Sequence, residues 1–353
     1  MPKGLLLFTD FHAYQWSEFS HLVPSKWGSI SDRFDNQIEV LDTILDTASK
    51  KNLVVVFAGD LFHQRNSVDT QVFNAVFDTF AKYCDSIPQI FLLRGNHDSI
   101  NNTMESPTSL SPFNYLNNTK VIAEPARRYV EIDGLGQLTI DFMPYGEDIQ
   151  QIKKVLAEQS KTVKGPAVRV FHLGIDGAKQ GRHSHRLASA FTLDDLYPDY
   201  YDLVYGGHYH KRQYLGGRNS VLYGGSTVPL NFDDEGENKG YDIYIPKQSF
   251  DFTESNSKKF ITLNHWDDSL QDKYKNYYVR LQLPEKEAKD IETNKTDTVR
   301  VEAQPDVDKT TRLGIKADNT PVEITKKYTD EYYPAVSKEA SDVIRGVLEG
   351  DNS

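Results

Sequence analysis

Cysteine is almost absent from this sequence. Among its 353 residues Cys84 stands alone, so no internal disulfide bond can form and nothing indicates an oxidising compartment. Long hydrophobic runs are missing too: the longest, at residues 4–8 and 53–59, fall far short of the ~20 residues of a membrane-spanning helix. The N-terminus lacks the apolar core of a secretory signal, because Asp10 interrupts the first run. We expect a soluble protein of the cytoplasm, with no membrane partner.

A surplus of basic residues is also lacking. Lysine and arginine number 40 against 51 aspartates and glutamates, which gives a net charge of −11, and the acidic residues are spread along the chain. Phosphate binding by surface residues alone needs clustered lysine and arginine. The composition therefore argues against a protein that wraps nucleic acid by itself. It leaves room for an enzyme whose metal ions supply positive charge locally.

The first hundred residues alternate short apolar runs with helical patterns. Residues 5–8, 53–57 and 90–93 are typical of buried strands, and between them apolar residues recur at helical spacing over 34–48 and 68–80. This alternation predicts parallel strands joined by crossover helices. The length suits two domains, or one large domain with an appendage.

The pattern then changes. Residues 129–132 and 138–143, joined by an Asp-Gly-Leu-Gly turn, predict a hairpin, and residues 147–158 predict a helix. Further strands are predicted at 168–172, 203–206, 220–224 and 277–283. Because the polar stretch 251–276 shows no helical period, we place a domain boundary near residue 270. The predicted parts are 1–270, a small domain at 271–330 and a C-terminal segment at 331–353.

The C-terminal segment carries an amphipathic pattern. Five apolar residues recur at i, i+3, i+4, i+7 and i+8: Ala340, Val343, Ile344, Val347 and Leu348. Ser337 is a suitable N-cap for the helix that they predict. Since a helix of about 13 residues is marginal alone in water, something must cover this stripe. It either packs on its own small domain or docks in a groove on a partner.

Polar side chains follow five of the predicted strands. The segments are Asp10-Phe11-His12, Gly59-Asp60-Leu61-Phe62-His63, Gly95-Asn96-His97-Asp98, Phe171-His172-Leu173-Gly174 and Gly207-His208-Tyr209-His210. The carboxyl ends of parallel strands form the ligand crevice of an α/β sheet, so these side chains are expected to meet. Taken singly, the first, second and fourth motifs are common on a surface, in a turn or in a core, whereas the segments at 95–98 and 207–210 are more specific. All five in this order, each at a strand end, indicate one functional site.

The residue types favour a site for two metal ions. Mixed nitrogen and oxygen ligands suit Mn²⁺, Fe or Zn²⁺ better than Ca²⁺ or Mg²⁺. Two ions ~3.5–4 Å apart need a bridging carboxylate, and together they can clamp an in-line displacement at phosphorus. Asp60 is our candidate for the bridge.

The motif order over residues 1–245 resembles that of the calcineurin-like metallophosphoesterases. Within that superfamily the chain resembles the SbcD-type recombination and repair exonucleases. The finer resemblance rests on the Gly-Asp-Leu-Phe-His motif at 59–63, on Phe-Met-Pro-Tyr-Gly at 142–146, on the Gly-Gly-Ser-Thr segment at 223–229, and on Lys239-Gly240-Tyr241. Segment 13–31 departs from the pattern: it is longer than expected and carries Tyr14, Trp16 and Trp27.

The resemblance implies an α/β fold, a four-layer sandwich of two mixed sheets flanked by helices, with a small C-terminal α/β capping domain and a C-terminal helix. One metal ion would be held by Asp10, His12, Asp60 and His210, and the second by Asp60, Asn96, His172 and His208. His97 would stabilise the transition state or protonate the leaving oxygen, and His63 would orient His97. Two divalent ions, with Mn²⁺ as the expected metal, are implied as cofactors.

The implied function is hydrolysis of DNA, as an exonuclease and single-strand endonuclease in double-strand-break repair and recombination. DNA, an SbcC-type ATPase subunit and a second copy of the chain are the implied partners, and the ATPase could receive the C-terminal helix. Lys211 and Arg212, next to the last ligand, are candidates for phosphate contact. The cluster of Lys179, Arg182 and Arg186, with His183 and His185, is either a DNA-binding surface or a solvated loop. A protein or nucleotide phosphatase and an inactive scaffold are the alternatives.

Overall fold

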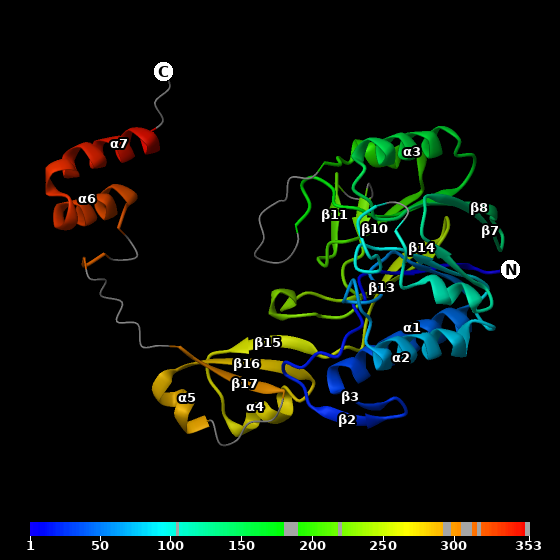
Figure 1. The fold of residues 1–353 in the computed structure, drawn as a ribbon, viewed down its shortest axis with the longest axis horizontal. Helices are drawn as coiled ribbons and strands as arrows, with labels where there is room; N and C mark the ends of the chain where they lie inside the picture. The colour runs from blue at the N-terminus through cyan, green and yellow to red at the C-terminus, as the bar shows by residue number, and fades with distance from the viewer. Residues whose placement is uncertain are drawn as a thin grey trace. The chain divides into compact units, whose positions relative to one another are not determined.

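The computed structural model describes residues 1–103, 106–179, 190–217, 221–291, 298–304, 313–315 and 319–349 (Figure 1). It forms two compact units, Met1–Leu281 with Asn294–Arg300, and Gln282–Thr293 with Val301–Ser353. Within the described ranges, no helix combines the length and the apolar character that crossing a membrane requires. The boundaries at 270 and 330 stay predictions of the sequence.

Two six-stranded mixed sheets make up most of the first unit. The first has the order β14-β13-β1-β4-β5-β6. Its parallel strands are β1 (Gly4–Phe8), β4 (Leu53–Phe57), β5 (Ile90–Leu93) and β6 (Thr119–Ile122). Along one edge β13 (Gly240–Ile245) runs antiparallel to β1, and β14 (Ser249–Glu254) antiparallel to β13.

The second sheet has the order β11-β12-β10-β9-β8-β7. Its parallel strands are β8 (Gly136–Met143), β9 (Ala167–His172), β10 (Leu203–Gly207) and β12 (Val221–Tyr223). The outer strands β7 (Ala126–Ile132) and β11 (Gln213–Leu215) run antiparallel to their neighbours. The predicted hairpin is confirmed as β7 and β8.

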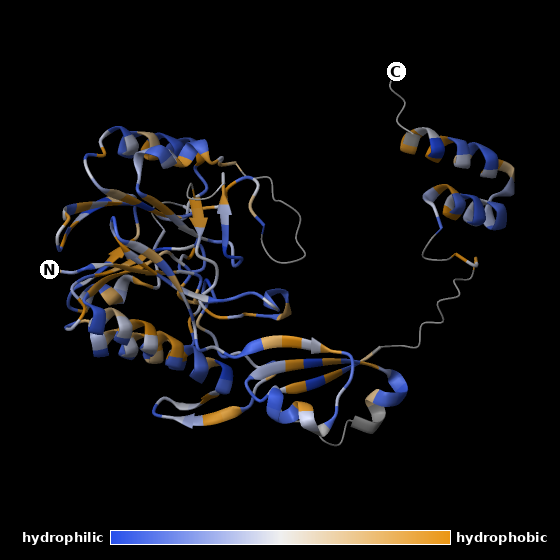
Figure 2. Ribbon diagram, turned by 180° about the vertical axis from the view of Figure 1, so that it is seen from behind, coloured by the Kyte–Doolittle hydropathy of each residue, from blue (hydrophilic) through white to orange (hydrophobic). Residues whose placement is uncertain are grey.

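The side chains of β1 show how the layers form. Leu5 and Leu7 point between the two sheets, where they pack in one cluster with Val168 and Val170 of β9. The alternate residues Leu6 and Phe8 face the other way, against α1 (Asp32–Lys51) and α2 (Thr70–Tyr83). On the far side of the second sheet, α3 (Ile149–Lys161) buries Ile152 and Leu156. The result is the order helix, sheet, sheet, helix, and the strands are rich in hydrophobic residues (Figure 2).

Caps fix where the crossover helices begin. The Ser31 hydroxyl accepts the backbone N–H of Phe34 at the start of α1, and the Asp69 carboxylate accepts those of Gln71 and Val72 at the start of α2. Asn52, at φ 54°, ends α1 in the left-handed conformation and turns the chain into β4. Each βα unit therefore returns its next strand parallel to the last.

Smaller elements occupy two segments that the sequence left open. The long segment 13–31 contains the hairpin β2 (Leu22–Ser25) and β3 (Gly28–Ser31). The stretch 251–276, where no helical period is visible, holds the rest of β14, the strand β15 (Lys259–Leu263) and the short helix α4 (Asp268–Lys273). With β16 (Tyr277–Pro284) and β17 (Val299–Gln304), β15 forms a three-stranded sheet. The strand predicted at 277–283 is confirmed as β16, whereas β15 and β17 are short and partly exposed, so hydrophobic patterning does not reveal them.

The second unit contains α5 (Glu285–Ile291), α6 (Pro321–Tyr332) and α7 (Ser337–Glu349). The C-terminal helix is thus present, but the prediction that Ser337 is its N-cap is wrong. A 3₁₀ turn at Pro334–Val336 precedes α7 and already places Ser337 at helical angles, φ −59° and ψ −41°. Its hydroxyl instead donates to Asp330 Oδ1 at 2.5 Å and accepts from Thr329 Oγ1 at 2.9 Å. These bonds join α7 to α6.

Candidate metal centre

The carboxyl ends of five parallel strands meet at one place. The chain leaves β1 and reaches Asp10 and His12, leaves β4 and reaches Asp60, and leaves β5 and reaches Asn96 and His97; His172 ends β9, and His208 and His210 follow β10. The structure brings all seven predicted ligands together there, from both sheets. Asp10, Asp60 and His172 are fully or almost fully buried.

One group of ligand atoms surrounds the imidazole of His12. Its Nε2 atom lies 3.0 Å from His210 Nε2, 3.7 Å from Asp60 Oδ2 and 3.9 Å from Asp10 Oδ1. His210 Nε2 is also 3.9 Å from Asp10 Oδ1. The potential ligand atoms of Asp10, His12 and His210 all lie within 4.8 Å of one another.

A second group surrounds the imidazole of His172. Its Nε2 atom lies 3.1 Å from Asn96 Oδ1 and 3.3 Å from Asp60 Oδ2. His208 Nδ1 approaches the same Asn96 oxygen at 3.0 Å. Asp60 Oδ2 belongs to both groups, which is the position required of a bridging carboxylate.

The donor set fits divalent transition metals. The Nδ1–H of His172 donates to the carbonyl oxygen of Ala58 at 2.7 Å, which assigns the proton to Nδ1 and turns the Nε2 lone pair toward Asp60. His12 Nδ1 is buried and, among the described residues, has no hydrogen-bond partner. Buried nitrogen and oxygen lone pairs that face one another at these distances are stabilised by a shared cation. Imidazole with carboxylate suits Mn²⁺, Fe or Zn²⁺.

Burial and mutual proximity shift the pKa values of these groups. Burial raises the pKa of Asp10. Burial also opposes ionisation of Asp60, but His172 outweighs it and holds the pKa of Asp60 well below its usual range. Although burial disfavours the charged imidazole, Asp60 raises the pKa of His172 to about 9. Burial and then the proximity of His172 lower the pKa of His208 to about 3. The site therefore carries negative charge that a proton on His172 offsets when no metal does.

The backbone of the site is strained. Of the nine described non-glycine residues with positive φ, four are predicted ligands: Asp10 at 49°, His12 at 48°, Asp60 at 64° and His208 at 103°. Such conformations cost on the order of 1–3 kcal/mol each and persist only where the surroundings enforce them. Here Asp10 N donates to the Gly59 carbonyl at 2.9 Å, and His12 N donates to the Asp60 carbonyl at 3.0 Å. Strain gathered on the ligands is typical of a functional site.

Two glycines allow the ligand loops to approach each other. A Cβ atom on Gly95 would lie 2.1 Å from Asp60 Oδ1, and one on Gly59 would lie 2.3 Å from His172 Nδ1. Gly59 also has φ of +106°, which side chains rarely adopt. Gly59, directly before Asp60, and Gly95, directly before Asn96, are therefore required by the metal centre.

Asp98, the last residue of the Gly-Asn-His-Asp motif, has a role that sequence reasoning missed. Its buried carboxylate accepts the backbone N–H groups of Asp60 (2.9 Å), Leu61 (2.9 Å), Phe62 (3.2 Å) and Gly95 (3.0 Å). Burial and the nearby charge of Asp60 raise the pKa of Asp98 to about 6. It ties the loop after β4 to the loop after β5. The sequence feature that could have indicated this role is the position of Asp98 directly after Asn96 and His97 in the same motif.

His97 lies beside the shared carboxylate. Its backbone N–H donates to Asp60 Oδ1 at 2.7 Å, and its Nδ1 donates to the carbonyl oxygen of His63 at 2.5 Å. The rings of His63 and His97 stack with centroids 5.8 Å apart. We expected the His63 side chain to orient His97. In the structure the main-chain carbonyl of His63 accepts the hydrogen bond from His97, and the His63 ring contributes only stacking. A ring nitrogen of His97 lies within 4.8 Å of ring nitrogens of His12 and His63, so this side chain borders the first group of ligand atoms.

Two other motifs from the sequence contact the ligands. The ring of Tyr145 stacks on that of His208, with centroids 5.6 Å apart. The Nζ of Lys239 donates to the carbonyl oxygen of His210 at 2.7 Å, and it is held by Asp234 at 2.6 Å and Glu237 at 3.1 Å. Lys239 is thus a buried anchor for the last ligand.

Two of the basic residues predicted to contact DNA bind carboxylates of the protein itself. Both terminal nitrogens of Arg212 bind the buried carboxylate of Asp242, at 2.6 and 2.7 Å, so its charge is used inside the protein. Lys211 pairs with Glu237 at 3.1 Å. Lys179 is exposed. Arg182 and Arg186, with His183 and His185, lie outside the described residues.

A family model covers the part of the chain that carries this site. The family model described as calcineurin-like phosphoesterase matches residues 5–212. An uncharacterized protein of Acanthamoeba polyphaga mimivirus is 22% identical over 208 residues, which is 57% of this chain and only 15% of that protein. A solved structure of a hypothetical protein from Thermus thermophilus is similar over 63% of this chain and 75% of its own, with 11% identity and a TM-score of 0.35.

The family match covers more than half of the chain and all seven predicted ligands. The chain therefore belongs to the calcineurin-like phosphoesterase family. Its site is that of a metal-dependent phosphoesterase, a hydrolase, with His and Asp clusters that fit two metal ions.

The shared carboxylate gives the first prediction. Asp60→Asn keeps an acceptor for the N–H of His97 but removes a charge that both ions would share. We expect loss of nearly all metal-dependent phosphodiester hydrolysis, and a larger loss of affinity for the second ion than for the first, while the melting temperature stays close to that of the parent protein. Titration with Mn²⁺ and elemental analysis measure the effect. Asp133→Asn, on an exposed turn, is the matched control; parent-like rates of Asp60→Asn at saturating Mn²⁺ would contradict the bridging role.

Proposed function

We propose that this chain is a dimetal-dependent DNA nuclease, an exonuclease and single-strand endonuclease of double-strand-break repair and recombination. The observation that carries the proposal is the place of His97, fixed beside the shared carboxylate of Asp60 with one ring nitrogen free. The features that resemble the SbcD-type nucleases also contact the site: His63 holds His97, Tyr145 stacks on His208, and Lys239 anchors His210. This concentration at the site favours a nuclease over another phosphoesterase.

The residues present can divide the work of hydrolysis. When bound, two divalent ions supply a nucleophile at neutral pH and stabilise the negative charge that develops at phosphorus. Asp60 orients the His97 main chain through Oδ1 while Oδ2 faces the ligand imidazoles. The hydrogen bond from Nδ1 to the His63 carbonyl orients the ring, and in the imidazolium form, which carries a proton on both nitrogens, Nε2 would donate a hydrogen bond or a proton to the leaving oxygen. Asp98 and Lys239 keep the ligand loops in place from behind.

The direct test compares substrates and metals. The full chain is incubated with end-labelled linear DNA, with single-stranded circular DNA and with p-nitrophenyl phosphate, each in Mn²⁺, Mg²⁺ or EDTA. We expect Mn²⁺-dependent loss of label and nicking of the circle, with little turnover of the monoester and none in EDTA. A reversed preference would indicate a protein or nucleotide phosphatase. No hydrolysis of any substrate, with no bound transition metal, would indicate an inactive scaffold.

A second variant separates chemistry from metal binding. His97→Ala removes a proton donor that is not a ligand in our assignment, so metal content should be retained while turnover of linear DNA falls by roughly 10²–10⁴, the usual contribution of a positioned acid. Single-turnover rates and elemental analysis measure both. His265→Ala, at an exposed site outside the metal centre, is the control. If metal content falls along with the rate, His97 is a ligand.

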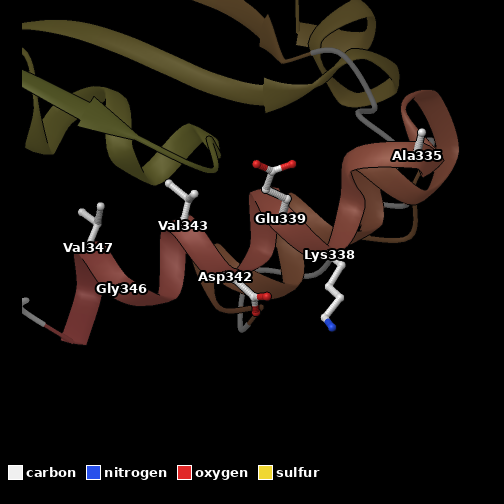
Figure 3. A pocket seen from close by; sticks show the side chains of 7 residues that line it. All are labelled: Ala335, Lys338, Glu339, Asp342, Val343, Gly346 and Val347. Atoms are coloured by element: carbon white, nitrogen blue, oxygen red, sulfur yellow. The ribbon is translucent and has the colours of Figure 1, made fainter.

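Partners follow from the same proposal: DNA, an SbcC-type ATPase subunit and a second copy of the chain. The surface that suits the ATPase lies on the α6–α7 pair of the second unit. Val343 is 59% exposed and Val347 73%, and both lie on the open surface of α7. They extend to the same side of the helix as Glu339, whereas Lys338 and Asp342 point the other way (Figure 3). An apolar stripe of this kind fits a helical partner.

Substitution of the stripe tests this partnership without removing the helix. Val343→Asp with Val347→Asp should abolish co-purification with the ATPase and any stimulation by ATP, while Mn²⁺-dependent nuclease activity of the isolated subunit is retained. Arg345→Ala, exposed and off the stripe, should change neither. Deletion of 319–353, which removes α6 and α7 together, should behave like the double variant. If the deletion instead unfolds the protein or lowers its basal activity, the stripe packs on its own chain.

A further inference from the structure

The segment after the ligand His12 places two aromatic rings against the ring of His63. The ring of Trp16 lies 4.7 Å from that of His63, and the ring of Tyr14 lies 5.1 Å from it, between centroids. Tyr14 and Trp16 also meet edge to face at 5.2 Å. Since His63 stacks on His97, an unbroken series of rings leads from the metal centre outward. These aromatic residues belong to segment 13–31, which departs from the family pattern.

The two rings are held rigidly. One buried side chain, Gln37, accepts the indole N–H of Trp16 at 3.2 Å and the backbone N–H of Tyr14 at 3.3 Å. The amide nitrogen of Gln37 donates to the carbonyl of His12 at 3.2 Å, so the aromatic segment is tied to a ligand. Beneath Trp16, the Arg33 guanidinium lies 4.9 Å from the ring and donates to two main-chain carbonyls.

The side chains of Tyr14 and Trp16 are partly exposed to solvent. Tyr14, Trp16, His63 and His97 are each only partly buried, although Gln37 and Arg33 behind them are buried. His63 Nδ1 has no hydrogen-bond partner among the described residues, so ring contacts and main chain alone position that side chain. A partly exposed, preorganised aromatic pair next to a phosphate site matches the way nucleic-acid enzymes hold bases. Trp27 of the same segment is held by other residues: its indole donates to Asp78 at 3.0 Å, and Lys26 Nζ lies 4.5 Å from its ring.

We propose that Tyr14 and Trp16 form a stacking wall for a nucleobase of the substrate strand beside the scissile phosphate. This inference rests on the proposed nuclease function and specifies its substrate: a nucleoside phosphodiester, read by the flat face of the base. Stacking accepts every base, because each has a π face. The wall gives an acidic chain an uncharged means of holding DNA next to its metal centre.

The test compares two diesters with one leaving group, thymidine 5′-(p-nitrophenyl phosphate) and methyl p-nitrophenyl phosphate, in Mn²⁺. The parent protein should prefer the thymidine ester. In Trp16→Ala and Tyr14→Ala, kcat/KM for the thymidine ester should fall about tenfold or more beyond any fall for the methyl ester, mainly through KM, as expected for a lost base stack. Trp16→Phe and Tyr14→Phe should keep most of the preference. Trp27→Ala, the matched tryptophan of the same segment, should keep all of it.

Binding in EDTA supplies a readout that needs no turnover. Anisotropy of a labelled single strand should show tighter binding of oligothymidylate than of an abasic strand of equal length, and Trp16→Ala should remove the difference. Equal losses on both esters, or parent binding that ignores the bases, would overturn the wall and leave Tyr14 and Trp16 as supports for His63. If the parent protein hydrolyses no diester, the proposed function fails, and the EDTA experiment still decides whether the wall exists.

Discussion

The carboxylate of Asp60 is the point on which the structure of the site depends. Oδ1 accepts a hydrogen bond from the main-chain N–H of His97. Oδ2 faces the imidazoles of His12 and His172, one from each ligand group. Both sheets must therefore end at the same level, and the loops after β4 and β5 must come within van der Waals contact. Gly95 permits that approach, and four N–H bonds to Asp98 maintain it. Positive φ at the ligands is the cost of this convergence.

Such a site is electrostatically incomplete without cations. The buried carboxylates of Asp10 and Asp60 face three imidazoles whose charged forms are disfavoured by burial. Asp60 nevertheless raises the pKa of His172 to about 9, so in the absence of a cation this imidazole carries the compensating proton. A metal ion held by His172 and Asp60 would take the place of that proton, with the Nε2 lone pair of His172 as one of its ligands. Local charge can thus favour a phosphate ester although the whole chain carries −11. The net charge of a protein says little about a site where ions are bound.

Sequence patterns could predict the features that strand ends determine. The alternation of strands and helices, and the meeting of seven polar side chains at the carboxyl edges, follow from local motifs and the geometry of parallel sheets. Long-range pairing could not be read in this way. Arg212 looks free beside His210, yet its partner Asp242 lies on a strand of the other sheet. The Asp98 carboxylate accepts backbone N–H groups of two loops, and the 3₁₀ turn before α7 puts Ser337 inside the helix and not at its N-cap. Hydrophobic periodicity contains no information about either contact.

The division between strand ends and segment 13–31 also explains how one scaffold can hold different substrates. Ligands fixed by five strand ends cannot shift without disturbing both sheets, whereas an inserted loop can change length and composition freely. Here the loop is not independent, because Gln37 on α1 binds both its aromatic residues and the carbonyl of His12. A single buried amide therefore sets the aromatic rings at a fixed distance from a metal ligand. Through Gln37, α1 holds the aromatic segment and the metal ligand His12 in one fixed arrangement.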